Sequence, residues 1–152
     1  MKKEEQKMYT TSMTPEKALA SFGLGCAQHV FGEFAPQLGI DRETALKTAA
    51  LFGSGMFEGG TCGAVVGGLM AIGLRFGQGD DPDPEKQELL RQKGEEFKAK
   101  YKEKYGSCIC REILGRKIPE ELEQIEAENK FVTVCSRAIA DACALCAEIL
   151  NG

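Results

Sequence analysis

The sequence predicts an all-α protein, a single-domain bundle of about five helices with a buried glycine-rich helix at its centre. Apolar residues recur at spacings of three and four, next to residues that commonly cap helices. No stretch shows the strict alternation typical of half-buried strands. A chain of 152 residues is long enough for one domain with a real core and short for two.

The first half of the chain begins with a polar, aperiodic stretch, so residues 1–13 are predicted to be a flexible tail. Thr14 and Pro15 begin a helix that we expect to end near Pro36. Its apolar stripe includes Ala18, Phe22, Cys26 and Val30. Asp41 is predicted to cap a second helix, which the glycines that begin at Gly53 should end.

The central helix is predicted to begin at Cys62, after Thr61 as its cap, and to end near Phe76. It is apolar almost all round, which is typical of a helix buried on every side. Gly63, Gly67 and Gly68 are poor helix formers, so their presence indicates that another backbone or a ligand lies close to this helix.

The second half of the chain continues the helical pattern. A strongly charged helix is expected over 85–105, followed by a short one over 108–115. Pro119 opens an acidic helical stretch, and a last helix should span about 130–150. We therefore expect one helical, cysteine-rich domain over residues 14–152.

Charge and hydropathy exclude several classes of function. The net charge is −4 with a sequence pI near 5.2, and basic residues alternate with acidic ones, so we expect no nucleic-acid partner. The longest near-apolar run, residues 63–74, is shorter than the roughly 20 residues that a membrane span needs. The charged start of the chain does not resemble a secretory signal. These features predict a soluble, cytoplasmic protein.

Cysteine is the most informative residue type in this chain. There are seven cysteines, an odd number that would leave one unpaired in a full disulfide framework. In a reducing cytoplasm such a set is more often catalytic, redox-active or metal-binding than structural. The alternative is that several are small buried hydrophobes. The seven are Cys26, Cys62, Cys108, Cys110, Cys135, Cys143 and Cys146.

Cys62 is the leading candidate for a reactive thiol. At a helix N-terminus, free backbone amides and the helix dipole favour the thiolate, which is both the nucleophile and the metal ligand. The neighbouring Gly63 leaves the sulfur accessible. The competing interpretation is a buried cysteine in a tightly packed glycine-rich helix.

Three other features carry less chemical information. Cys108 and Cys110 form a C-x-C pair, whose thiols would share a face in a strand and diverge in a helix. Cys143 and Cys146 form a C-x-x-C on a helix without the strand context of a thioredoxin motif, so an apolar core role is favoured. His29, one turn after Cys26, is either a base or ligand partner or an ordinary buried histidine.

The cysteine pattern resembles the C_GCAxxG_C_C family, whose members are inferred to be redox-active from their cysteines. The core of the motif matches Cys62-Gly63-Ala64-Val65-Val66-Gly67. The first cysteine matches Cys26, the third Cys110 and the fourth Cys135. The resemblance covers roughly residues 18–150 and implies a small bacterial or archaeal protein, often encoded near transporters.

Three hypotheses follow for the function. In the first, Cys62 is the reactive thiolate and Cys26, Cys110 or Cys135 resolves a mixed disulfide. In the second, these four cysteines bind zinc or an iron–sulfur cluster. In the third, the protein is a helical partner-binding domain with structural cysteines. The expected partner is a redox protein or a transporter-associated protein.

Overall fold

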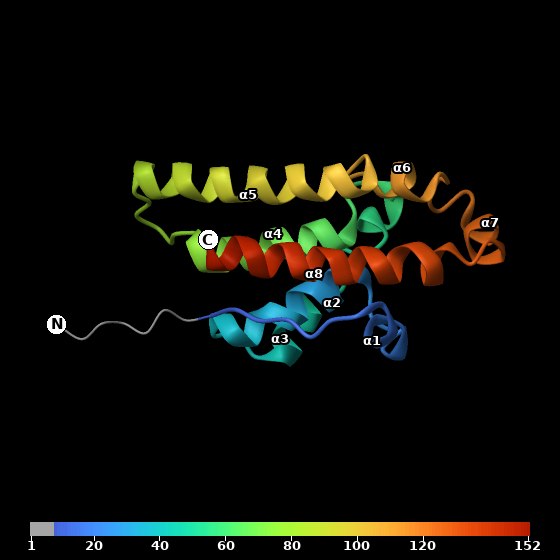
Figure 1. Ribbon diagram of the computed structural model, residues 1–152, viewed down its shortest axis with the longest axis horizontal. Helices are drawn as coiled ribbons and strands as arrows, with labels where there is room; N and C mark the ends of the chain where they lie inside the picture. The colour runs from blue at the N-terminus through green and yellow to red at the C-terminus, as the bar shows by residue number, and fades with distance from the viewer. Residues whose placement is uncertain (1–7) are drawn as a thin grey trace.

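The protein is all-α, as its sequence predicts. Its computed structural model describes residues 8–152 (Figure 1). Within that range there are eight α-helices instead of about five, and no strand beyond one isolated bridge between Thr61 and Ile109. The helices are α1 (Pro15–Ala20), α2 (Cys26–Phe34), α3 (Arg42–Thr48), α4 (Gly63–Phe76), α5 (Pro84–Tyr105), α6 (Cys110–Leu114), α7 (Leu122–Ala127) and α8 (Ser136–Asn151). Shorter helical turns are η1 (Ala35–Leu38), η2 (Gly55–Gly59) and η3 (Phe131–Cys135).

The long helices form layers that position the rest of the chain. Helices α4 and α8 pack on each other, with α5 against both on one side and α2 against both on the other (Figure 1). Helix α3 packs on α2, and α6 and α7 lie at one end of the bundle (Figure 1). The start of α2, the start of α4, α6 and η3 therefore meet at that end.

The expected first helix is split in two, which is one reason why the predicted number of helices was wrong. Helix α1 ends at Ala20, and α2 begins only at Cys26. Gly23 and Gly25 lie in the connection, where the low helix propensity of glycine makes a break inexpensive. The break places Cys26 in the first turn of a new helix instead of in the middle of a longer one.

Other boundaries shift by smaller amounts. Helix α3 ends at Thr48, and the last predicted helix divides into the π-turn η3 and α8. The charged helix is confirmed as α5, with Asp83 accepting a hydrogen bond from the amide of Glu85 at its start. Helix α4 begins one residue later than predicted, with Cys62 as its N-cap.

The glycines of α4 allow other parts of the chain to approach it closely. A Cβ atom at Gly67 would lie 2.7 Å from the carbonyl oxygen of Ala27 in α2. A Cβ atom at Gly68 would collide with the ring of Phe97 in α5. However, α4 is not buried on every side as expected, because its last turn reaches the surface and leaves Leu74 40% exposed.

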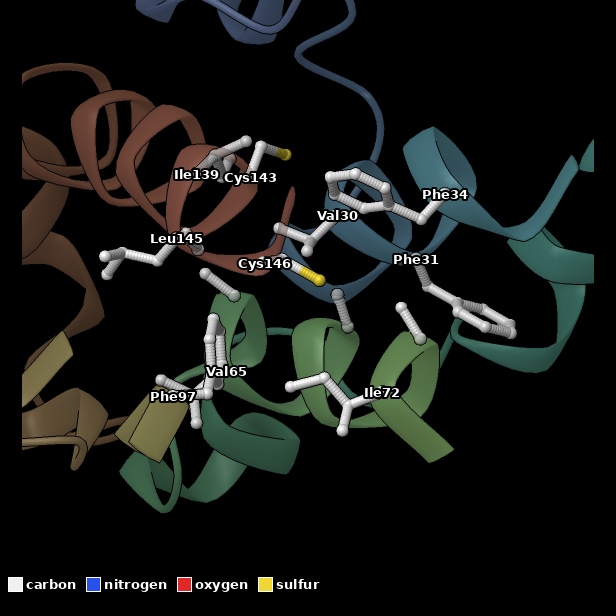
Figure 2. Close-up of a cluster of buried hydrophobic side chains, with 14 of the residues drawn as sticks. Val30, Phe31, Phe34, Val65, Ile72, Phe97, Ile139, Cys143, Leu145 and Cys146 are labelled. Atoms are coloured by element: carbon white, nitrogen blue, oxygen red, sulfur yellow. The ribbon is translucent and has the colours of Figure 1, made fainter. Parts of the chain in front are cut away.

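The main core lies between α2, α4, α5 and α8. Figure 2 shows side chains from all four helices in this cluster, including Val30, Val65, Phe97 and Leu145. Cys143 and Cys146 of α8 lie among these apolar side chains (Figure 2). Both are fully buried, which favours the core role for this C-x-x-C pair.

The segment before α1 lies along the bundle and makes specific contacts. The predicted tail of residues 1–13 falls partly outside the described residues, which begin at 8. The amide of Tyr9 donates to Oδ1 of Asn151 at 2.8 Å, and Nδ2 of Asn151 donates to the carbonyl of Tyr9 at 2.9 Å. Thr10 makes a similar pair of bonds with Gln37.

Over the part of the chain that the structure describes, no helix combines the length and the apolar character that crossing a bilayer requires.

Candidate functional site

Four cysteines far apart in the sequence line one small internal cavity, called here the inner cavity. Its volume is about 20 Å³. Cys26 comes from the first turn of α2, Cys62 from the N-cap of α4, Cys110 from the start of α6 and Cys135 from η3. These are the four positions that the family resemblance singles out.

Two local features of the backbone bring these cysteines together. At the isolated bridge, the amide of Cys62 donates to the carbonyl of Cys108, and the amide of Cys110 donates to the carbonyl of Gly60. The bridge therefore holds the starts of α4 and α6 side by side. Gly63 completes the arrangement, because a Cβ atom there would lie only 3.0 Å from the Cβ atom of Cys26.

A second, larger cavity reaches the surface beside the inner one and is called here the outer cavity. Its volume is about 280 Å³, and Phe22, 59% exposed, stands at its edge. The two cavities share four lining residues, which are Cys26, Ser54, Phe131 and Cys135. Cys62 and Cys110 line only the inner cavity. A molecule in the outer cavity therefore meets Cys26 and Cys135 before the other two thiols.

Cys26 is the cysteine whose surroundings favour the thiolate. A hydrogen bond from the thiol of Cys135 lowers the pKa of Cys26 below its ordinary value, against the opposing effect of burial. The backbone amides of Cys26 and Ser54 lower this pKa further. The same hydrogen bond, together with burial, raises the pKa of Cys135. Of the two thiols, Cys26 therefore loses its proton more readily.

The loop beside Cys26 supplies one of these amides. Gly53 and Gly25 are in backbone contact, since a Cβ atom added to Gly53 would lie 3.4 Å from the Cα atom of Gly25. Ser54 follows in the left-handed region, with a φ of 52°. This conformation, uncommon for a residue with a side chain, directs the Ser54 amide toward the sulfur of Cys26.

Cys62 behaves differently from the expectation based on its helix N-terminus. Burial, followed by the nearby Cys26, raises the pKa of Cys62 to about 11. A hydrogen bond with Tyr101, at 3.2 Å between Sγ and the hydroxyl oxygen, and the amides of Ala64 and Val65 lower it. The helix N-terminus thus acts in the expected direction, but loss of hydration for a side chain only 7% exposed outweighs it.

The remaining four cysteines also have raised pKa values, so their thiols are protonated at pH 7. Burial raises the pKa of Cys110 to about 12, and Cys110 is 6% exposed. Burial also raises the pKa values of Cys108, Cys143 and Cys146. Cys108 is half-buried, and its Sγ lies 3.6 Å from the carbonyl oxygen of Lys98, outside both cavities.

His29 lines the outer cavity together with Cys26 and is almost completely buried. Burial and the positive charge of Arg42 lower its pKa, while a hydrogen bond to the backbone of Ser21 acts in the opposite direction. His29 is therefore neutral at pH 7 and already has a hydrogen-bond partner, as a satisfied buried histidine does.

The four cysteines were also predicted as ligands for zinc or an iron–sulfur cluster. Such sites need three or four thiolates converging on one point. Within residues 8–152, no group of three or more His, Cys, Asp or Glu side chains is placed so that it could hold a metal ion. Metal binding therefore stays a prediction that this geometry does not support, although the four cysteines line one cavity.

Two contributors to the site did not emerge from the sequence as functional residues. Ser54 lies between two glycines in the break after the second predicted helix, and short polar residues in such turns commonly adopt the left-handed conformation. Tyr101 lies in α5, the helix that the sequence predicts as strongly charged. No local pattern shows that its hydroxyl group reaches Cys62 from a different helix.

Comparison with known proteins agrees with the cysteine pattern. The model of one family, described as "Putative redox-active protein (C_GCAxxG_C_C)", matches residues 24–149. No match was found among curated proteins or among solved structures. The matched range contains all four cysteines of the inner cavity and covers most of the chain. The chain therefore belongs to the C_GCAxxG_C_C family.

Proposed function

We propose that this protein carries out thiol–disulfide exchange, with Cys26 as the attacking thiolate and Cys135 as the resolving thiol. The observation that carries the proposal is that Cys26 and Cys135 are the two cysteines that line both cavities, where their thiols interact beside an opening to the surface. The thiolate is the reactive form of cysteine, and Cys26 is the one cysteine within residues 8–152 whose pKa is lowered. The redox character of the family supports the same chemistry.

The proposed reaction has two steps. The Cys26 thiolate attacks one sulfur of a small disulfide RSSR, so that a Cys26–SR bond forms, the R–S–S–R bond breaks and RS⁻ leaves. Cys135 then loses its proton and attacks the sulfur of Cys26, which forms the Cys26–Cys135 disulfide and releases a second RS⁻. Both thiolates take up protons, one from Cys135 and one from water. Two electrons pass from the protein dithiol to the substrate.

Cys62 has a secondary role in this proposal, in contrast to the role that its sequence position predicts. Its raised pKa and its position behind Cys26 make it a poor first nucleophile. Cys62 and Cys110 border the inner cavity next to the exchanging pair, where a disulfide on Cys26 would face them. They are therefore alternative resolving thiols.

The test is to identify which sulfur reacts first. Reduced full-length protein is mixed with a small disulfide, quenched with acid at short times and digested, and each cysteine is assigned by mass spectrometry. We expect a Cys26–Cys135 disulfide in the wild type and a trapped mixed disulfide on Cys26 in Cys135→Ser. Cys26→Ser should abolish rapid reaction.

Cys108→Ser is the matched control, because Cys108 is half-buried like Cys26 and Cys135 but lines neither cavity. It should leave the rate and the product unchanged. If Cys62 carries the first mixed disulfide, or if Cys26→Ser reacts as fast as the wild type, the assignment of Cys26 is wrong.

A further inference from the structure

The walls of the outer cavity are mostly apolar. They include Leu19 near the end of α1, Phe22 in the following connection, Phe131 in η3 and Ile139 in α8. The cavity, at about 280 Å³, is close to the lower end of the range typical of small-molecule sites. It therefore has room for a small molecule in contact with Cys26 and Cys135.

Few polar side chains line the outer cavity, and besides the two cysteines they are His29, Ser54 and Ser136. None of the lining residues is an acid, a lysine or an arginine. The hydroxyl group of Ser136 donates to the carbonyl of Val132, and His29 bonds to the backbone of Ser21. A charged group that entered would lose its hydration, which costs several kcal/mol. An anion would meet the negative Cys26 thiolate, and a cation would have that single thiolate as its only opposite charge among the lining residues.

We infer that the outer cavity selects uncharged disulfides with short apolar arms as substrates for the Cys26–Cys135 pair. This inference rests on the proposed exchange reaction and adds the substrate class. The apolar arm of RSSR would lie against Leu19, Phe22 and Ile139, with one sulfur at Cys26. Charged disulfides, including peptide disulfides with free carboxylates, would be disfavoured.

The net charge of the protein suggests a different basis for substrate selectivity, which is electrostatic steering. At −4, the whole protein attracts cations at long range. If electrostatic steering decided the rate, a cationic disulfide would react fastest. If the cavity decides it, the uncharged disulfide reacts fastest and both cations and anions react more slowly.

The experiment uses full-length Cys135→Ser and three disulfides of nearly equal length. They are dipropyl disulfide, which is uncharged, cystamine, which carries two positive charges, and dithiodiglycolate, which carries two negative charges. The rate of mixed-disulfide formation at Cys26 is divided by the rate of the same disulfide with 2-mercaptoethanol thiolate. This ratio removes differences in intrinsic reactivity. We expect the ratio for dipropyl disulfide to exceed the other two by at least about tenfold.

Three variants test whether the selectivity lies in the cavity. Leu19→Lys places a cation at the half-buried edge of the cavity and should raise the dithiodiglycolate ratio relative to dipropyl disulfide. Leu89→Lys adds the same charge on exposed α5, away from the lining residues, and should leave the selectivity unchanged. Phe22→Ala, at an exposed position, should reduce the preference for dipropyl disulfide.

The outcomes separate the two proposals. If the three disulfides modify Cys26 with equal ratios, or if cystamine is favoured, the substrate class is wrong while the exchange reaction stands. Equal effects of Leu19→Lys and Leu89→Lys would also overturn the cavity assignment. If none of the disulfides modifies Cys26 although each reacts with 2-mercaptoethanol, the proposed function itself fails.

Discussion

At the scale of single residues, Cys135 has two separate roles in the proposed chemistry. Its thiol donates the hydrogen bond that lowers the pKa of Cys26, and its sulfur closes the disulfide. These roles are separable by substitution, because a serine hydroxyl group donates a hydrogen bond but forms no disulfide.

The first prediction concerns the pH dependence of Cys26. In Cys135→Ala the Cys26 thiolate loses its hydrogen-bond donor, so the pKa of Cys26 rises. The alkylation rate of Cys26 then reaches half of its maximum at a higher pH than in the wild type. In Cys135→Ser the hydroxyl group replaces the donor and the midpoint stays low. The measurement is the iodoacetamide rate of the Cys26 peptide against pH, followed by mass spectrometry. Identical midpoints in the two variants would show that the hydrogen bond does not hold the thiolate.

The sequence identified the cysteines that line the inner cavity but did not identify which two interact. The family pattern is sufficient to select Cys26, Cys62, Cys110 and Cys135. The pairing depends on the break before α2 and on the Ser54 turn, which are set by backbone contacts between distant segments. The pKa of Cys62 was predicted in the wrong direction, because the dipole of a helix is visible in a sequence and the depth of burial is not.

At the scale of elements, α4 places the site through its glycines. Gly63 and Gly67 both face α2, whose first turn carries Cys26. A Cβ atom added at Gly67 would lie 2.7 Å from the carbonyl oxygen of Ala27 and 3.1 Å from the amide nitrogen of Phe31. Both are backbone atoms of α2, so they cannot move without shifting that helix.

Two glycines of α4 provide the second prediction. Gly67→Ala should lower the free energy of unfolding by about 1–3 kcal/mol, because α2 and α4 would be forced apart. Gly73→Ala is the control in the same helix, since a Cβ atom there would have no neighbour within 4 Å. It should raise the free energy of unfolding by about 0.5–1 kcal/mol through helix propensity. Urea denaturation measures both, and equal effects would contradict the close packing described.

Helices were predictable where local chemistry sets their ends. Asp83 and Pro84 begin α5 and Gly106 follows it, all recognisable from the sequence. The starts of α1 and α3, with Thr14 and Asp41 as caps, were also predicted correctly. The end of α1, the start of α2, the end of α3 and the start of α8 were misplaced because contacts between segments decide them. The turn η3 is an example, since it precedes α8 without any proline or glycine to mark it.

At the scale of the whole molecule, the segment before α1 connects both ends of the described chain. Tyr9, 8% exposed, is held by two hydrogen bonds to Asn151 at the end of α8. Thr11 continues the segment, where its hydroxyl group donates to Glu33 of α2. These contacts place the segment across α2, which carries Cys26, and α8, which follows Cys135.

The third prediction tests this attachment. Asn151→Ala removes both bonds to Tyr9, each worth about 0.5–1.5 kcal/mol, so chymotrypsin should cleave after Tyr9 severalfold faster under native conditions. The control is Glu148→Ala, which changes an exposed residue of the same helix and should leave this cleavage unchanged. Mass spectrometry of the product gives the rates, and an unaltered rate in Asn151→Ala would mean that other contacts hold the segment.

The hydrogen bond between Cys26 and Cys135 links oxidation to folding. A disulfide between Cys26 and Cys135 would join residues that are 109 positions apart in the sequence (135 − 26). In the chain-entropy model, closing a loop of about 100 residues lowers the entropy of the unfolded chain by the equivalent of about 4.7 kcal/mol. By thermodynamic linkage, the fold must favour the disulfide by the same amount relative to the unfolded chain. The stabilised thiolate of Cys26 opposes this preference by favouring the reduced state. The reduction potential of the Cys26–Cys135 pair is therefore set by two opposing contributions, the loop entropy of the whole chain and the stability of the Cys26 thiolate.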